Sequence, residues 1–255
     1  MEKVIELLSL NKSFNGEKVI ENLNYTFFSN EIVVLLGYSG VGKSTLLRIL
    51  SGLDHQYQGE VKYASDINVS KSIIPIVFQS FDQLLPWYTV KKNILLPYKK
   101  ENDKLKIFNE IIDILDLGNA LHKYPKELSG GMKQRTAIAR ALLAKSKVIL
   151  FDEPFSSLDI TMRQSLQNLV LKIQRKYNQT IIFVTHDIEE AIFLGDRLLI
   201  MADSKTRHDI TLNSENKERY TNPFDQQVRK VIKIIEGSTQ YNVTNLRRLD
   251  NNRIM

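Results

Sequence analysis

Nine consecutive residues near the N-terminus have the composition and spacing of a phosphate-binding loop. Residues 37–45 read GYSGVGKST, which fits the pattern G-x-x-x-x-G-K-[ST]. Glycines allow successive backbone N–H groups to turn inward, and a helix that starts within the loop directs its positive end toward the same anion. Lys43 would reach the β- and γ-phosphates of a nucleotide, and Ser44 would offer its hydroxyl to Mg²⁺. The residues expected to bind the nucleotide here are Gly37, Ser39, Gly40, Val41, Gly42, Lys43, Ser44 and Thr45.

The segments on either side of this loop favour a ligand. Residues 32–36 form a short apolar run typical of a buried strand, and residues 46–50 have a helical pattern. The alternative is a glycine turn that binds no ligand. By chance alone, the pattern would occur in about one chain in a hundred of this length. The loop alone does not distinguish kinases, GTPases, helicases and transporter ATPases.

Two acidic residues end another apolar run. Residues 148–151 are followed by Asp152 and Glu153, so a strand here would deliver both carboxylates to the carboxyl edge of a parallel sheet, where ligands bind. We expect Asp152 to hold Mg²⁺, directly or through water. Glu153 is expected to accept a proton from the attacking water or to orient it. A strand that ends in solvated acids is the alternative.

Two more polar residues follow apolar runs in the same way. His186 comes after residues 181–185, and we expect it to contact the γ-phosphate, although a lone histidine is more often structural. Gln79 comes after residues 73–78, where its amide could bind Mg²⁺ or the attacking water. With Glu153, these two residues form the predicted catalytic set, and the predicted metal ligands are Ser44, Gln79 and Asp152.

The remaining pattern predicts a parallel sheet covered by helices after an antiparallel start. Residues 3–8 and 18–28 read as strands around Asn15 and Gly16, a dipeptide favoured in tight hairpins. Apolar residues from Leu166 to Tyr177 recur at helical spacing between two of the later runs. The runs expected to form buried strands are residues 32–36, 147–151, 181–185 and 197–201. Alternation of strands and helices of this kind is typical of an α/β fold.

A helical subdomain is predicted within the sheet domain, at about residues 85–144. Strand patterns stop there, and Ile107, Ile111 and Ile114 lie at helical spacing. A further helix is expected at residues 224–235, after Asn222 and Pro223. The predicted organisation is one domain over residues 1–237 and a polar, basic tail over residues 238–255.

Two adjacent glycines occur in this helical region. Residues 128–135 read LSGGMKQR, and a helix gains nothing locally from such a pair. They suit a second anion-binding helix start, with Ser129 and the following N–H groups facing a phosphate. Glycines that only turn the chain are the alternative.

In order and spacing, these motifs resemble those of the ATP-binding cassette (ABC) ATPases over about the first 200 residues. The resemblance involves the phosphate loop, Gln79, residues 128–132, residues 152–153, residues 156–159 and His186. It implies a P-loop NTPase fold of the RecA-like type: a mostly parallel sheet, an N-terminal antiparallel β subdomain and an inserted α-helical subdomain. It also implies an ATP-hydrolysing transporter subunit that uses ATP and Mg²⁺ at the cytoplasmic face of the cell membrane.

The resemblance further implies how the chain assembles. In the family two cassettes meet head to tail, so Ser129, Gly130 and Gly131 would serve the nucleotide of the second chain of a homodimer. Asp159 would cross the same interface. Phe14 is the aromatic residue expected to stack on adenine, with Tyr25 and Phe27 as alternatives. The implied partners are an integral membrane permease and a solute-binding protein, with no nucleic acid.

Finer features resemble the importers of nitrate, sulfonates, taurine and thiamine precursors. These features are residues 84–90, residues 185–191 and Met132, which stands where the family usually has Gln. The serine and glycine N–H donors remain, so activity is still expected. Trp87 lies where the family docks a short permease helix, and the alternative is that it packs inside the helical subdomain.

Composition excludes several classes of function. Absence of cysteine rules out disulfides and thiol chemistry. The net charge of +6 is scattered along the chain, which does not favour a nucleic-acid surface. No apolar run reaches the roughly 18 residues that a membrane-spanning helix needs. An ABC ATPase of DNA repair or of ribosomes is the alternative function, and an exporter subunit also stays open. A regulator with little turnover conflicts with Glu153 and His186.

Overall fold

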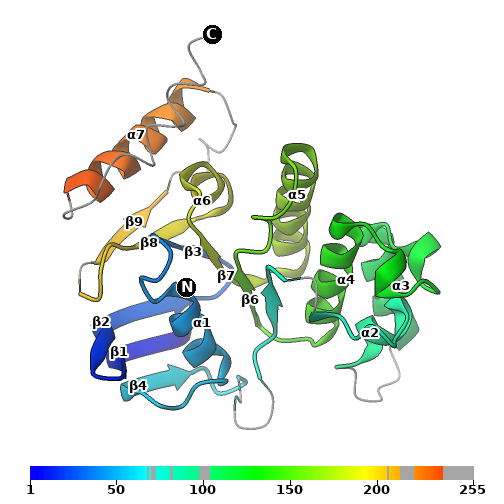
Figure 1. Cartoon of the computed structure of the whole chain (residues 1–255), viewed down its shortest axis with the longest axis horizontal. Coiled ribbons are helices and arrows are strands. Elements are labelled where there is room, and N and C mark those ends of the chain that lie inside the picture. Colours follow the sequence, from blue (N-terminus) through cyan, green and yellow to red (C-terminus); the bar gives the residue numbers. More distant parts are fainter. Residues whose placement is uncertain are drawn as a thin grey trace.

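A computed structural model describes residues 1–67, 69, 73–80, 83–97, 104–205, 207–212 and 221–237. Figure 1 shows a small antiparallel sheet, a larger sheet with helices packed against it, and a group of helices to one side. The predicted fold class, a mostly parallel sheet with an antiparallel β subdomain and inserted helices, is confirmed. The predicted tail over residues 238–255 lies outside the described residues.

The small sheet is built on the predicted hairpin. Strands β1 (Lys3–Phe14) and β2 (Glu17–Phe28) pair antiparallel. The turn between them uses positive φ angles, 49° at Asn15 and 85° at Gly16. Strand β4 (Gln58–Tyr63), which was not predicted, pairs with the other edge of β1. Its residues are mostly exposed and polar, so the sequence gives no apolar run to mark it.

The larger sheet has the strand order β5-β6-β7-β3-β8-β9. All neighbours pair in parallel except the last two strands, which are antiparallel. Parallel strands share one direction, so the carboxyl ends of β3, β5, β6 and β7 meet at one edge. The strand bounds are Ile32–Leu36 for β3, Ile76–Phe78 for β5, Val148–Asp152 for β6, Thr180–Thr185 for β7, Arg197–Met201 for β8 and Arg207–Thr211 for β9.

Most of these strands follow the prediction closely. The bounds of β3 and β8 are those predicted, and those of β6 and β7 differ by one residue. β5 is shorter than the predicted run of residues 73–78 because Pro75 has no N–H to donate, although its carbonyl accepts from Leu150. β9 was missed because its polar sequence, RHDIT, lies at the sheet edge.

Alternate residues of the buried strands face two separate hydrophobic cores. In β3, Ile32 and Val34 belong to a core shared with helices α4 to α7, whereas Val33 and Leu35 belong to a core shared with α1 and the antiparallel sheet. Burying a Val or Leu side chain contributes about 1.5–3 kcal/mol. The covering helices are α1 (Lys43–Ser51), α5 (Ile160–Tyr177), α6 (Ile188–Leu194) and α7 (Asn222–Gly237).

Helices dominate the segment between β5 and β6. Figure 1 shows them at the right of the molecule. They are α2 (Val90–Leu95), α3 (Lys104–Leu115) and α4 (Gly130–Leu143), with short 3₁₀ turns at Gly118–Ala120 and Pro125–Glu127. Within described residues 83–97 and 104–143 no strand occurs. The helical character was predicted, while the limits of this subdomain and of the domain as a whole stay predictions.

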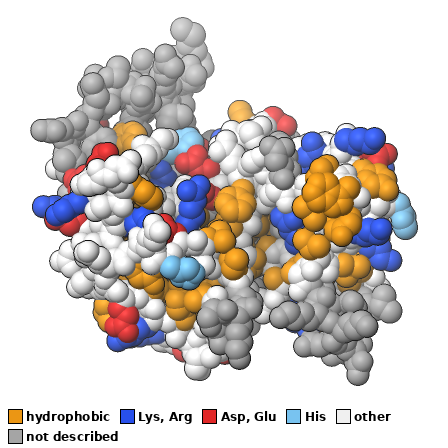
Figure 2. Space-filling view, turned by 60° about the horizontal axis from the view of Figure 1, so that its bottom comes forward, with side chains coloured by type: hydrophobic (Ala, Val, Ile, Leu, Met, Phe, Trp, Pro, Cys, Tyr) orange, Lys and Arg blue, Asp and Glu red, His pale blue; other side chains and the backbone are white. Residues whose placement is uncertain are grey.

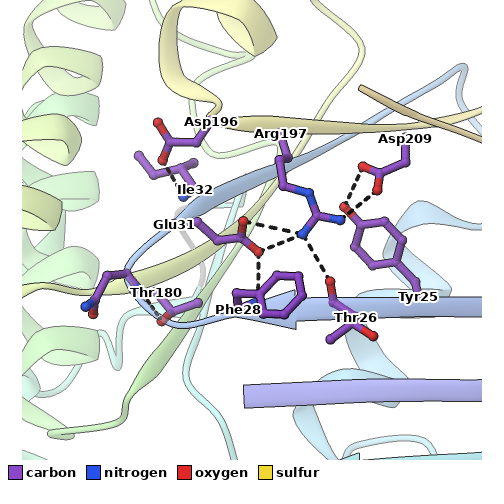
Figure 3. A network of polar contacts seen from close by, with 10 residues as sticks. Tyr25, Thr26, Phe28, Glu31, Ile32, Thr180, Asp196, Arg197 and Asp209 are labelled. Atoms are coloured by element: carbon purple, nitrogen blue, oxygen red, sulfur yellow. Dashed lines mark hydrogen bonds and ion pairs between the residues drawn. The ribbon is translucent and has the colours of Figure 1, made fainter. Parts of the chain in front are cut away.

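A polar network joins the two sheets (Figure 3). Arg197, at the start of β8, donates to the Thr26 carbonyl at 3.1 Å and to Glu31 at 3.0 Å, and it donates to Asp209 on β9 at 2.7 Å. The Tyr25 hydroxyl donates to the same Asp209 at 3.1 Å. Burial raises the pKa of Glu31, although the Arg197 charge opposes this. The network therefore ties the antiparallel hairpin to the larger sheet.

Candidate active site

The phosphate loop lies between β3 and α1, as predicted. Gly40 and Gly42 have φ angles of 85° and 102°, which side-chain-bearing residues rarely adopt. A Cβ at Gly42 would also come within 2.8 Å of Val19, and a Cβ at Gly37 would overlap the Met201 carbonyl oxygen. Neighbouring strands thus leave room only for the backbone at these positions.

Lys43 is buried at the base of the loop. Its Nζ donates to the carbonyls of Gly37 at 2.6 Å and Tyr38 at 2.8 Å, and it lies 3.9 Å from Glu153. Burial lowers the pKa of Lys43, and the charges of Glu153 and Asp152 oppose that shift. A phosphate could exchange for the carbonyl acceptors, so the lysine is already placed beside its expected ligand.

Ser44 and Asp152 form a pair with the chemistry of a magnesium site. The Ser44 hydroxyl donates to Asp152 Oδ1 at 2.8 Å. Burial raises the pKa of Asp152, and the hydrogen bond from Ser44 opposes this shift. Among the described residues, no group of three or more His, Cys, Asp or Glu could hold a metal. A hydroxyl and one carboxylate fit Mg²⁺, which is usually held by one or two carboxylates together with substrate phosphates.

Glu153 and His186 form the second pair at this edge. His186 Nδ1 lies 3.0 Å from Glu153 Oε2. This hydrogen bond lowers the pKa of Glu153 and raises the pKa of His186. Glu153 has a φ of 46°, and its N–H donates to the Val184 carbonyl at 3.1 Å. The carboxylate is thus held ionised between Lys43 and His186, as a water-orienting or proton-accepting group requires.

An open pocket of about 530 Å³ joins most of these groups. Gln79 lines it together with the loop and the two acids, so the structure brings three separate sequence motifs into one site. Ser80, which was not predicted, also lines it. His186 reaches the site through Glu153. The full lining is Ser39, Gly40, Gly42, Lys43, Ser44, Thr45, Phe78, Gln79, Ser80, Asp152 and Glu153.

The predicted second anion site lies elsewhere. Ser129 caps α4, its hydroxyl accepting from the Met132 N–H at 3.3 Å, and Asp159 caps α5, accepting from the Met162 N–H at 2.9 Å. Neither residue lines the pocket beside the phosphate loop, and Gly130 and Gly131 do not line it either. Within one chain these residues do not meet the phosphate loop, and their service to a partner's nucleotide stays a prediction.

Burial decides among the predicted adenine-stacking aromatics. Tyr25 and Phe27 are in the core, with exposed fractions of 8% and 0%. They cannot stack on a nucleotide, so both alternatives are wrong. Phe14 is 48% exposed at the end of β1, and the Lys12 ammonium lies 4.7 Å from its ring centroid. Its contact with adenine stays a prediction.

The segment that carries Gln79 is held by residues that sequence reasoning missed. Gln83 bonds to Phe78 twice: its side chain accepts from the N–H at 3.2 Å and donates to the carbonyl at 2.9 Å. From α4, Gln134 donates to the same Phe78 carbonyl and Arg140 donates to the Gln83 carbonyl. Only the packing of α4 against β5 reveals these contacts.

Comparison with known proteins agrees with this geometry. A family model described as ABC transporter matches residues 20–156. The aliphatic sulfonates import ATP-binding protein SsuB of Bacillus subtilis (strain 168) is 44% identical over 188 residues, which cover 72% of each chain. An uncharacterized ABC transporter ATP-binding protein of Methanocaldococcus jannaschii is 34% identical and covers 91% of this chain and 90% of its own.

Solved structures show the same fold. A bacterial ABC transporter cassette solved as a dimer superposes with a TM-score of 0.70 at 31% identity, covering 82% of this chain and 99% of its own. A cassette in a post-hydrolysis state bound to ADP and Pi gives a TM-score of 0.68 at 29% identity, over the same shares of the two chains. With the family model matching over half of its length, the chain belongs to the ABC transporter family, as an ATP-binding and ATP-hydrolysing subunit.

Proposed function

We propose that this chain powers the import of an aliphatic sulfonate through a separate membrane permease. ATP hydrolysis as the energy source is supported by one observation: two pairs, Ser44 with Asp152 and Glu153 with His186, meet at one edge of the sheet beside the pocket. The solute class is supported by the names of similar proteins, since SsuB relatives from several bacteria are 40–44% identical to this chain.

The predicted site residues then have distinct tasks. Loop N–H groups and Lys43 bind the β- and γ-phosphates of ATP. Ser44, Asp152 and Gln79 would hold Mg²⁺, and the ion would neutralise negative charge that develops on the phosphates. Glu153 accepts a proton from the attacking water or orients it, while His186 fixes the Glu153 carboxylate and contacts the γ-phosphate. Phe14 supplies a surface for adenine.

The working unit is a head-to-tail homodimer. Ser129, Gly130, Gly131 and Asp159 lie outside the pocket of their own chain, at the N-terminal ends of α4 and α5. In the dimer these helix ends face the ATP of the partner, where N–H groups and the helix dipole favour a phosphate. ATP therefore closes the pair, and loss of the γ-phosphate opens it again.

The permease docks on the helical insertion. Figure 2 shows hydrophobic side chains gathered among basic ones at the right of the molecule, where Figure 1 places α2 to α4. The large hydrophobic residues exposed on this insertion include Trp87 at 66%, Leu96 at 51% and Tyr124 at 42%. The alternative that Trp87 packs inside is therefore wrong. Exposed apolar residues of this size, rimmed by polar ones, are typical of a protein interaction surface.

The segment that carries Trp87 and the segment that carries Tyr124 are joined by backbone hydrogen bonds. The N–H of Val90 donates to the Lys123 carbonyl at 2.9 Å, and that of Lys91 donates to the Leu121 carbonyl at 3.0 Å.

None of the described helices is both long and apolar enough to span a bilayer. We place the chain at the cytoplasmic membrane face, bound through its permease, with a solute-binding protein completing the system.

The test begins with isolation of the tagged chain from gently solubilised membranes. Mass spectrometry should identify a polytopic permease, and the complex in vesicles should then take up labelled ethanesulfonate on addition of ATP. The Glu153→Gln complex serves as the inactive control. Recovery of ribosomes or DNA-repair proteins in place of a permease would refute transport, and uptake of another solute in place of the sulfonate would refute the solute class alone.

A further inference from the structure

Arg163 lies between two loops that lead away from the active site: residues 153–159, which follow β6, and residues 186–187, which follow β7. It is in the first turn of α5, which begins after Asp159, and it faces Asp187, the residue that follows His186. The inference below concerns ATP hydrolysis and does not depend on the proposed solute. No motif in the sequence marked this arginine.

The guanidinium contacts both loops at once. Nη2 donates to the Leu158 carbonyl at 3.2 Å, and Nη1 lies 3.6 Å from Asp187 Oδ2. The other carboxylate oxygen of Asp187 accepts from the Glu190 N–H at 3.0 Å, which caps α6. Asp187 is thus held from two sides, and the planar fork of an arginine suits two acceptors in different directions.

A buried contact supports this arrangement one turn further along the helices. Gln167 follows Arg163 by four residues, so both lie on the same face of α5. Its amide donates to Glu190 Oε1 at 2.6 Å, and the two side chains are 1% and 6% exposed. A hydrogen bond to a carboxylate in such a site is costly to lose. The two contacts hold α5 and α6 in a fixed register.

These contacts form a closed circuit that includes Glu153 and His186. From Glu153 the chain runs through Ser156, whose hydroxyl donates to the Glu153 carbonyl at 3.0 Å, to Leu158. Arg163 then bridges Leu158 to Asp187, and the adjacent His186 returns to Glu153. One side chain therefore contacts both the residue that follows His186 and the residue that precedes Asp159.

We infer that Arg163 is a positioning residue for hydrolysis: through Asp187 it sets His186 against Glu153, and through the Leu158 carbonyl it sets the loop that leads to Asp159. Neither the Leu158 carbonyl nor the Asp187 carboxylate belongs to the phosphate loop. Loss of the arginine should therefore slow the chemical step while ATP binding is retained.

The test compares three variants of the full-length ATPase. Arg163→Ala should lower kcat on the order of tenfold to a hundredfold, as expected when reacting groups are displaced by about an ångström, and leave the KM for ATP nearly unchanged. Arg163→Lys should recover part of kcat because a lysine can reach one acceptor. Arg175→Ala, at an exposed position in the last turn of α5, should match the wild type.

Two outcomes would overturn the inference. One is a folded Arg163→Ala protein with wild-type kcat, and the other is a raised KM with unchanged kcat. If the alanine variant does not fold, Arg163→Lys decides: reduced kcat at unchanged KM supports the role, and wild-type kcat refutes it.

A double-mutant cycle tests the route through Asp187. Asparagine at this position keeps a cap for α6 but removes the charge that faces Arg163. If Arg163 acts through this carboxylate, adding Asp187→Asn to Arg163→Ala should change kcat little further. If kcat of the double variant instead falls by the product of the two single-variant factors, Arg163 does not act through Asp187.

Discussion

Ser44 and Asp152 meet through a hydrogen bond of 2.8 Å although 108 positions separate them in the chain. Ser44 is in the first turn of the helix that follows β3, and Asp152 ends β6; β7 lies between these two strands in the sheet. Parallel strands bring both ends to one edge, where the hydroxyl and the carboxylate form the proposed Mg²⁺ site.

Removing the carboxylate charge should weaken the response to magnesium. Asp152→Asn is isosteric and can still accept from Ser44, but it lacks the charge that attracts a divalent cation. We expect the Mg²⁺ concentration for half-maximal ATPase activity to rise on the order of tenfold to a hundredfold. ATPase activity measured over a Mg²⁺ series checks this. Asp113→Asn, an exposed change on α3, is the matched control, and equal Mg²⁺ responses of the two variants would contradict the assignment.

Gly37 should tolerate no side chain. An alanine Cβ there would overlap the Met201 carbonyl oxygen, and this backbone atom of β8 cannot rotate away. Overpacking of this kind usually costs about 1–3 kcal/mol. We expect Gly37→Ala to lower the free energy of unfolding by at least that amount and to raise the KM for ATP, because the phosphate loop must shift. Urea unfolding and ATPase kinetics measure the two effects.

The chain contains a suitable comparison for this change. Gly118 has no heavy atom within 4 Å of a Cβ built on it, and it lies in a 3₁₀ turn of the helical insertion. Gly118→Ala should leave stability and KM close to those of the wild type. Similar losses in both variants would mean that contact with Met201 is not the cause.

The buried strands and the phosphate loop were predictable because their signals are local. An apolar run such as residues 32–36 marks a strand buried on both faces, and a glycine pattern marks a nest for phosphate. β4 and β9 left no such signal, since both are edge strands with polar, partly exposed residues. Their positions depend on pairing with distant strands.

Side-chain environments were less predictable than strands. Tyr25 and Phe27 alternate with polar residues on β2, and sequence alone did not separate them from Phe14 as adenine partners. The exposed fractions separate them, because burial depends on which face of β2 packs against the core. Arg163 was missed for a related reason: its partners are Leu158, in the loop before α5, and Asp187, which caps α6, and only the packed fold brings the two near each other.

The arginine of the inter-sheet network should be essential for stability. Arg197→Met removes the cation that faces Glu31 and Asp209, and Glu31 is only 5% exposed. Breaking a buried ion pair on one side typically costs about 3–5 kcal/mol, since an uncompensated charge remains. Urea unfolding should show a loss of this size. Lys62→Met, which removes an exposed ion pair with Glu60, is the control and should change stability by about 1 kcal/mol or less.

The free energy of unfolding should also depend on pH through the buried carboxyl group of Glu190. Burial is the main cause that raises its pKa; hydrogen bonds from Thr185 and Gln167 and the charge of Arg163 oppose the shift, whereas the charge of Asp187 adds to it. A raised pKa in the folded state means that the protonated form favours folding. That contribution is complete below the ordinary pKa of about 4.5 and is lost as the pH rises through the folded-state pKa.

Glu190→Gln mimics the protonated group and keeps an acceptor for Gln167, so it should remove this pH dependence. Its free energy of unfolding, relative to that of the wild type, should increase as the pH rises above 4.5 and should level off only above the folded-state pKa of Glu190. Urea unfolding at several pH values measures the difference. Glu189→Gln, on the same helix but partly exposed, should show a much smaller trend. A relative stability of Glu190→Gln that falls with pH would mean that the ionised carboxylate is the form that the fold favours.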